Sequence, residues 1–198
     1  MLEEFLKELE EEGLKEKVPI ASQEVAKFLK FMVGLTKSEQ ILEIGTAIGY
    51  STTYLAWGLG ERSGQITTID IQLERLEQAK NNLARAGLRE KVHFILGDAK
   101  EVLPTLTGPY DYIFLDSAKG QYLNLLPECL RLLKPGGLLV TDNVYFRGMV
   151  EGQVPLHPRF KTIVKRLRQY LDTLKQHPEL DTIILSLGDG LALSYKKR

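Results

Sequence analysis

One segment constrains the fold of this chain more than any other, Ile41-Leu-Glu-Ile-Gly-Thr-Ala-Ile-Gly-Tyr-Ser51. It starts as an apolar run suited to a buried strand, turns at Gly45 and Gly49, and enters a helix near Ser51. A strand that passes through a glycine turn into a helix brings free backbone N–H groups to one point. Such a point binds a carboxylate or a phosphate, and we expect the rest of the chain to be organised around it.

Beyond this segment the chain alternates predicted strands and helices. After a strand at 41–45 and a helix at 50–59, the pattern predicts a charged helix up to Ala86, a helix at 121–133, a turn at 134–137, and strands at 65–70, 92–96, 110–116 and 138–142. This order predicts an α/β fold with a mostly parallel sheet and helices on both faces. Two final apolar runs, 181–187 and 191–195, flank Gly188-Asp-Gly190 and predict an antiparallel hairpin.

We expect residues 1–37 to form an N-terminal part of two helices and 38–198 to form the main domain. A helix is predicted at 2–12 and a second at 23–35, with Ser22 as its N-cap. Because both precede the first strand, they pack on the sheet, over the site, or against another subunit. Residues 144–158 are rich in glycine and proline, so we expect a loop there that acts as a lid.

Composition excludes several classes of protein. The 198 residues carry 26 basic and 26 acidic side chains, and this zero net charge argues against a protein that coats nucleic acid. No apolar run approaches the length of a membrane span, and the acidic, amphipathic N-terminus differs from a signal peptide. The single cysteine, Cys129, is expected in the core. We therefore expect a cytoplasmic protein with no membrane contact.

Positive charge is nevertheless concentrated in one stretch. A basic helix is predicted at 159–175, and the basic residues in and near it are Arg147, Arg159, Lys161, Lys165, Arg166 and Arg168. Such a stretch is either a solvated helix face or a surface that contacts phosphates.

Acidic residues follow four of the predicted strands. They are Asp70, Asp98, Asp116 and Asp142, and the last is followed by Asn143. The carboxyl ends of parallel strands meet at the edge of the sheet where ligands bind. Any one of these acids could cap a helix. Four of them in register around a glycine turn favour a binding site.

The acids of the first strands match the parts of S-adenosylmethionine. The Glu-x-Gly-x-x-x-Gly pattern that starts at Glu43 resembles motif I of S-adenosylmethionine-dependent methyltransferases. Its glycine spacing differs from the dinucleotide fingerprint, which disfavours a nicotinamide dehydrogenase. Asp70 can accept both ribose hydroxyls, and Asp98 with Ala99 can meet the adenine edge. The turn, with Gly45, Thr46 and Ser51, would hold the methionine end.

The later acids favour a metal. Asp116, Asp142 and Asn143 supply three hard oxygen ligands from two strands, a set that suits Mg²⁺ (or Mn²⁺). Lys119 lies three residues after Asp116. It could take a proton from a substrate hydroxyl, orient that oxygen, or be a solvated loop lysine.

From about residue 18 to the end, the chain resembles the divalent-metal-dependent O-methyltransferases, a family that includes catechol and caffeoyl-CoA enzymes. The resemblance is carried by 41–51, Ile69-Asp70, Gly97-Asp98-Ala99, Asp116-Ser-Ala-Lys119 and Asp142-Asn143. It implies a class I methyltransferase fold with a seven-stranded sheet, and a homodimer. It assigns catalysis to Lys119 and Asp116, and the metal to Asp116, Asp142 and Asn143. The cofactor residues that it implies are Glu43, Gly45, Thr46, Gly49, Ser51, Asp70, Ile71, Asp98, Ala99 and Asp116.

A bacterial subgroup that methylates 5-hydroxyuridine in tRNA is similar in further motifs. These are Val18-Pro-Ile, Ala118-Lys-Gly-Gln-Tyr122, Asp142-Asn-Val-Tyr-Phe-Arg-Gly148, and Gly188-Asp-Gly-Leu-Ala-Leu-Ser194 with the Lys196-Lys-Arg198 tail. The similarity implies methylation at the wobble position of the tRNA anticodon loop, giving 5-methoxyuridine. The basic stretch and the tail would then bind the flanking phosphates.

Two other functions remain open. One is a small-molecule O-methyltransferase of the catechol or caffeoyl-CoA type. The other is a cofactor-binding module without catalysis. Catechol-type enzymes usually carry larger aromatic or acidic residues where Ser117 and Ala118 stand, so we expect a more open pocket here. The N-terminal extension is also short for the tRNA-modifying subgroup.

Overall fold

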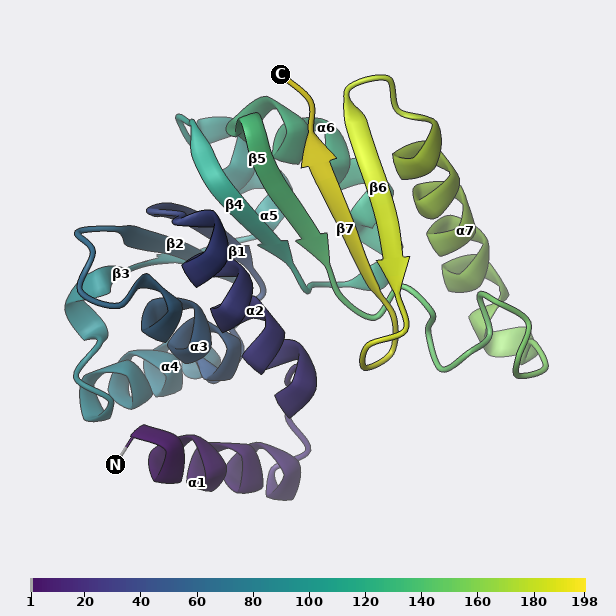
Figure 1. Ribbon diagram of the computed structural model, residues 1–198. Helices are drawn as coiled ribbons and strands as arrows, with labels where there is room; N and C mark the ends of the chain where they lie inside the picture. Colours follow the sequence, from purple (N-terminus) through teal and green to yellow (C-terminus); the bar gives the residue numbers. More distant parts are fainter. Residues whose placement is uncertain (1) are drawn as a thin grey trace. The chain divides into compact units, whose positions relative to one another are not determined.

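The computed structural model describes residues 2–198 and confirms the predicted α/β fold, with one seven-stranded sheet (Figure 1). The strand order is β3-β2-β1-β4-β5-β7-β6. The pairs β1 with β2, β2 with β3 and β4 with β5 are parallel, and β7 is antiparallel to both β5 and β6. The strands are β1 (Gln40–Ile44), β2 (Gln65–Asp70), β3 (Val92–Leu96), β4 (Tyr110–Leu115), β5 (Leu133–Thr141), β6 (Leu180–Leu185) and β7 (Leu191–Lys196). The helices are α1 (Leu2–Lys15), α2 (Gln23–Thr36), α3 (Tyr50–Leu59), α4 (Leu73–Arg85), α5 (Ala99–Val102), α6 (Tyr122–Leu132) and α7 (Lys161–Gln176).

The chain divides into two compact units, of which the first ends at Val102 and the second is Leu103–Arg198. The first contains the parallel strands β1, β2 and β3 together with α1 to α5. Ile44 is paired with Ile69, and Asp70 with Leu96, so the carboxyl ends of these three strands are level. Helix α3 packs on β2, and α4 packs on β2 and β3.

The N-terminal helices belong to this first unit. Helix α2 begins after Ser22, whose hydroxyl accepts a hydrogen bond from the Val25 amide, as predicted for an N-cap. Helix α1 runs three residues further than expected, to Lys15. Its Leu6 and Leu9 are buried in one cluster with Ile48 of the glycine turn. Helix α1 therefore packs against the glycine turn, and its role toward the site or another subunit stays a prediction.

The second unit contains the parallel pair β4 and β5 and the hairpin of β6 and β7, which Figure 1 shows beside α7. Strand β7 lies antiparallel to β5, with Thr141 paired to Ala192. The turn at 186–190 is therefore at the same edge of the sheet as the end of β5. The predicted hairpin is confirmed, and this register matters for the site below.

The predicted start of the fifth strand is wrong. We expected a turn at 134–137 and a strand from 138, but β5 begins at Leu133. Leu133 is paired with Tyr110 and Leu138 with Tyr112, so four residues of β5 bulge between two pairs that are close together on β4. Gly136 has a φ of +83° within this bulge. The turn-forming residues thus interrupt a strand and do not precede it.

Two further features follow the predictions closely. The basic helix starts at Lys161, after a 3₁₀ turn at Pro158–Phe160. Cys129 is buried and unpaired, as expected for a core residue. Within residues 2–198, no helix is both long and apolar enough to span a membrane.

Candidate active site

The glycine turn after β1 is held in a strained conformation. The Gly45 amide donates to the Ile69 carbonyl at 2.9 Å, and the Ala47 amide donates to Asp70 Oδ2 at 2.8 Å. The φ angles of Gly45, Ala47 and Gly49 are +108°, +46° and +84°. A positive φ is unfavourable for alanine, so the contacts around the turn must hold it in place.

Gly49 is required for two reasons. It caps α3 in the left-handed region, where a side chain is strained. A Cβ atom there would also lie 2.7 Å from Leu83 Cδ2 and 3.3 Å from the Ala79 backbone. The turn can therefore approach α4 only because residue 49 has no side chain.

Glu43, predicted to bind the cofactor, faces the interior and is fully buried. Its Oε1 accepts a hydrogen bond from the Ser51 hydroxyl at 2.7 Å, and its Oε2 accepts bonds from Thr52 and Thr68. Thr68 also shares a 2.6 Å hydrogen bond with Thr46. These buried groups join β1, β2 and α3 beneath the turn. A direct cofactor contact by Glu43, Ser51 or Thr46 stays a prediction.

The end of β2 offers a carboxylate beside an apolar surface. Asp70 is half-buried, and its Oδ1 accepts a hydrogen bond from the Gln72 amide at 2.9 Å. Ile71 is 64% exposed, and Leu96, which ends the neighbouring strand, is 48% exposed. A carboxylate next to uncovered apolar side chains is suited to a nucleoside, whose sugar is polar and whose base is flat and apolar.

At the end of β3, Asp98 acts as a helix cap. Its Oδ1 accepts a hydrogen bond from the Lys100 amide at 3.0 Å, at the start of α5. Ala99 is the first residue of that short helix, and both residues are half-buried. The capping alternative is therefore realised, and the adenine contact stays a prediction.

In the second unit, the predicted metal residues Asp116 and Asp142 come together. Leu115 is paired with Thr141 at the ends of β4 and β5, and the Asp142 amide donates to the Leu115 carbonyl at 3.1 Å. The next residues, Asp116 and Asp142, therefore follow the two strand ends at one level. Lys119 Nζ donates to Asp116 Oδ1 at 2.7 Å, and both side chains are mostly buried. Lys119 is thus an ion-pair partner in the site and not a solvated loop lysine.

Burial and charge make Asp142 an unusual carboxyl group. It is only 1% exposed, and this burial, with the nearby Asp116 carboxylate, raises its pKa to about 7. A hydrogen bond from the Asn143 amide and the charge of Lys119 lower the pKa in part. The charge of Asp116 thus disfavours ionisation of Asp142, and a cation bound between the two carboxylates would offset this repulsion.

Asn143 completes the predicted set. It has a φ of +55° and is half-buried, directly after Asp142. Across residues 2–198, no three His, Cys, Asp or Glu side chains gather as a metal cluster. The predicted set contains two carboxylates and one amide, which are hard oxygen donors of the kind that Mg²⁺ and Mn²⁺ prefer. Ser117 Oγ, next to Asp116, is buried without a hydrogen-bond partner, so it is free to contact a polar group bound at this site.

One further acid lies near this site, although the sequence predicted it only as part of a hairpin turn. Asp189, in the hairpin turn, accepts two hydrogen bonds from the Arg147 amide, at 2.7 and 2.9 Å. Its pKa is raised, chiefly by burial, and its charge also raises the pKa of Asp142. Asp189 therefore ties the segment after Asn143 to the hairpin. The sequence feature that could have identified Asp189 is the predicted antiparallel hairpin, because an antiparallel β7 brings its turn to the end of β5.

Part of the predicted basic surface has a structural role. Arg166 donates to the Gly120 carbonyl, and Arg168 donates to the carbonyls of Met149 and Val150. In the tail, Lys196 and Lys197 also donate to backbone carbonyls. The other basic residues of the predicted stretch, Arg147, Arg159, Lys161 and Lys165, are exposed.

Comparison with known proteins gives one consistent result. The model of the family described as O-methyltransferase matches residues 1–197. Catechol O-methyltransferase of Mycobacterium tuberculosis is 34% identical over 184 residues, which are 90% of this chain and 80% of that protein. Caffeoyl-CoA O-methyltransferase 2 of Populus trichocarpa is 31% identical over 205 residues, 96% and 81% of the two chains. The structure of the Streptomyces achromogenes O-methyltransferase TomG with S-adenosylmethionine has a TM-score of 0.86 at 30% identity, covering 98% and 90%. The chain belongs to the O-methyltransferase family.

Proposed function

We propose that this O-methyltransferase transfers the methyl group of S-adenosylmethionine to one of two adjacent oxygens of its acceptor, with a divalent cation held by Asp116, Asp142 and Asn143. The observation that carries the proposal is the pair of carboxylates at the ends of β4 and β5, of which Asp142 is buried with a raised pKa. A bound Mg²⁺ or Mn²⁺ favours the deprotonated form of an acceptor hydroxyl at neutral pH.

Residues of the first unit serve the cofactor in this proposal. The turn from Gly45 to Ser51 receives the methionine end, where backbone N–H groups start α3. Asp70 accepts the ribose hydroxyls, and Ile71 covers one face of the base. Asp98 and Ala99 meet its edge. The family membership and the S-adenosylmethionine complex of the similar TomG structure support this cofactor.

Lys119 orients the reacting oxygen in this proposal. Its ammonium group lies 2.7 Å from Asp116 Oδ1, and an ammonium in an ion pair is a hydrogen-bond donor. It therefore stabilises an acceptor oxygen that has lost its proton. This geometry favours the orienting role over proton removal, the other role left open by the sequence. Positioning of the oxygen and the methyl donor then supplies much of the rate acceleration.

We propose 5-hydroxyuridine in a tRNA anticodon loop as the acceptor, with methylation of its 5-hydroxyl group. The adjacent 5-hydroxyl and C4 carbonyl oxygens give it the same two-oxygen arrangement as a catechol. A base in a single-stranded loop can leave the stack and enter a pocket. Lys161 and Lys165 are exposed one turn apart on α7, and in this proposal they bind the flanking phosphates. This substrate implies a cytoplasmic protein.

A catechol or other small aromatic diol is the second candidate acceptor. It is favoured by the names of the similar proteins, which include catechol and caffeoyl-CoA O-methyltransferases. The same Asp116, Asp142 and Asn143 set would serve it without the basic surface of α7. The two candidates therefore differ in whether Lys161 and Lys165 matter.

Methyl incorporation from labelled S-adenosylmethionine separates the two candidates. A tRNA that contains 5-hydroxyuridine and a simple catechol are offered in parallel. We expect label in the tRNA, and we expect Lys161→Glu with Lys165→Glu to raise the KM for tRNA. Lys175→Glu, a charge reversal in the last turn of the same helix, is the matched control. Label in the catechol alone would contradict the tRNA proposal and keep the metal site.

We also propose a homodimer that uses the N-terminal helices. Phe31 and Leu35, one turn apart on α2, are 63% and 64% exposed, and Leu14 of α1 is 66% exposed. Large apolar side chains left uncovered in this way favour association. Light scattering after gel filtration should give twice the chain mass. The double substitution Phe31→Glu and Leu35→Glu should give the single-chain mass, whereas a monomeric wild type contradicts the proposal.

A further inference from the structure

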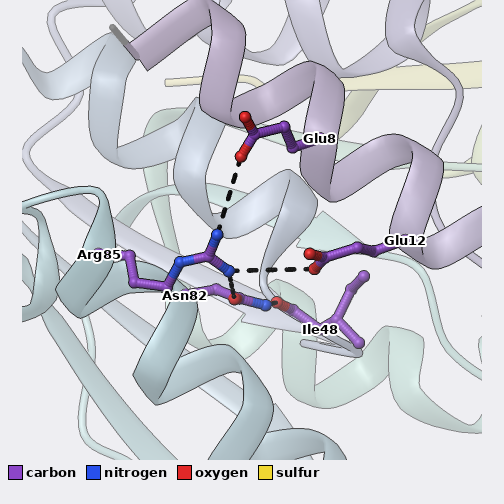
Figure 2. Close-up of polar contacts among 5 residues, drawn as sticks. All are labelled: Glu8, Glu12, Ile48, Asn82 and Arg85. Carbon is purple, nitrogen blue, oxygen red and sulfur yellow. Dashed lines mark hydrogen bonds and ion pairs between the residues drawn. The ribbon is translucent and has the colours of Figure 1, made fainter.

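A side chain of α4 holds the centre of the glycine turn (Figure 2). Asn82 is 8% exposed, and its Nδ2 donates to the Ile48 carbonyl at 3.0 Å. Ile48 lies between Ala47 and Gly49, which both have positive φ. The Ala47 amide is held from the other side by Asp70. Two consecutive residues of the strained turn are thus held from β2 and from α4.

The orientation of this amide is fixed by Arg85. Arg85 Nη1 donates to Asn82 Oδ1 at 3.3 Å. A guanidinium has only donors, so the Asn82 oxygen must face it and the Asn82 nitrogen must face Ile48. Arg85 therefore determines which group Asn82 offers to the turn.

Helix α1 in turn holds Arg85, as Figure 2 shows. Arg85 lies 3.8 Å from Glu8 Oε2 and 4.0 Å from Glu12 Oε2, and its guanidinium is 4.9 Å from the ring centre of Phe5. These ion pairs are half-exposed, so each is individually weak. Together they direct one guanidinium toward Asn82.

The turn needs these contacts because its backbone is strained. A residue such as Ala47 stays at positive φ only where the surrounding structure imposes that conformation. We propose that Asn82 is a positioning residue for S-adenosylmethionine: it holds the Ile48 carbonyl so that the turn is already formed when the cofactor binds. In the same proposal, α1 acts through Arg85 to hold Asn82. The inference rests on the proposed cofactor site at 45–51.

Asn82→Asp tests this role with little change of shape. The aspartate keeps an oxygen toward Arg85 but loses the donor toward Ile48, so two oxygens face each other. Asn81→Asp makes the same change at the next residue, which is exposed, and is the matched control. Binding of S-adenosylhomocysteine, measured by calorimetry, should weaken about tenfold in Asn82→Asp and less than about twofold in Asn81→Asp.

Kinetics distinguish positioning from general loss of structure. If Asn82 is a positioning residue, Asn82→Asp should raise the KM for S-adenosylmethionine. At saturating cofactor its kcat should stay within about twofold of the wild-type value. Arg85→Met keeps Asn82 but removes the guanidinium that orients it, together with the contacts of that group to α1. We expect it to weaken S-adenosylhomocysteine binding about threefold, and it decides the question if Asn82→Asp does not fold.

The outcomes separate this inference from the proposed function. If the wild type does not bind S-adenosylhomocysteine, the proposed cofactor site is contradicted, and so is the role of Asn82. If the wild type binds it and Asn82→Asp binds it equally well, the role of Asn82 is refuted while the cofactor site stands. A parallel fall of kcat, melting temperature and affinity in Asn82→Asp would show a general structural role and would also overturn the inference.

Discussion

Metal binding should depend on pH because Asp142 must lose a proton before it can act as a ligand. With a pKa of about 7, the carboxyl is mostly protonated at pH 6 and mostly ionised at pH 8. The apparent affinity for Mg²⁺ or Mn²⁺ should therefore rise about tenfold over this interval, since a ligand that is about nine-tenths protonated binds about one-tenth as well. An ordinary aspartate would give almost no change in this range.

The same shift fixes the sign of the stability change in the metal-free protein. The folded state holds the Asp142 proton more tightly than the unfolded state, because the folded pKa is raised above the ordinary 3.8. The contribution of Asp142 to the free energy of unfolding is therefore lost as the pH rises from about 4 to about 7, and it is constant above that. A bound cation reverses this loss, since it favours the ionised form.

Calorimetric titration with Mn²⁺ at about pH 6 and pH 8 measures the effect, with thermal unfolding as a second readout. Asp142→Asn should bind weakly at both pH values and lose the pH dependence. Lys119→Met removes a charge that lowers the pKa of Asp142, so the rise in affinity should move to higher pH. Equal affinity of the wild type at the two pH values, or a full pH dependence in Asp142→Asn, would show that Asp142 does not control metal binding.

Three further predictions follow from individual contacts. Glu43→Ala leaves the hydroxyls of Ser51, Thr52 and Thr68 without their acceptor, and urea unfolding should show a loss of about 3 kcal/mol or more; an unchanged midpoint would contradict this reading of the buried network. At Gly13 an added Cβ would lie 2.9 Å from Ile20 and 3.2 Å from Ile48, so Gly13→Val should displace Ile48 and weaken S-adenosylhomocysteine binding. Gly34→Val, where an added Cβ would meet nothing within 4 Å, should leave this binding unchanged. Asp189→Ala releases the Arg147 amide, so kcat should fall about tenfold with unchanged S-adenosylhomocysteine affinity, and a change in that affinity alone would count against the assigned role.

The predicted lid at 144–158 takes a more specific form in the structure. Its first part is tied down, because the Val144 and Tyr145 amides donate to the carbonyls of Gly190 and Asp189. Residues 151–159 are exposed. Lid function stays a prediction, and any closure would involve 151–159 more than the segment next to Asn143.

The order of elements could be predicted because the local sequence pattern identifies each of these strands and helices. The apolar run from Ile41 and the turn at Gly45 and Gly49 identify β1 and α3 without any knowledge of their neighbours. The start of β5 could not be found in this way. A Pro-Gly-Gly sequence is typical of a turn, and only pairing with β4 shows that the strand passes through it as a bulge.

The candidate site was predicted where acids follow strands, and less well where partners are distant in sequence. Asp116 and Asp142 come together as expected, because the ends of neighbouring parallel strands are level. The interior role of Glu43 depends on hydroxyls 8, 9 and 25 residues away. Asp189 becomes part of the site only because β7 lies next to β5. Such contacts are set by tertiary structure and cannot be predicted from a local sequence pattern.

If the proposed site is right, methyl transfer depends on a divalent cation held by Asp116, Asp142 and Asn143. The most direct test is methyl incorporation by the wild type after removal of metal, with and without added Mg²⁺, beside Asp142→Ala and the control Asp111→Asn at the other end of β4. We predict transfer by the wild type and by Asp111→Asn only when Mg²⁺ is present, and none by Asp142→Ala in either case. Full activity in the presence of EDTA, or an Asp142→Ala enzyme as active as the wild type, would contradict the account.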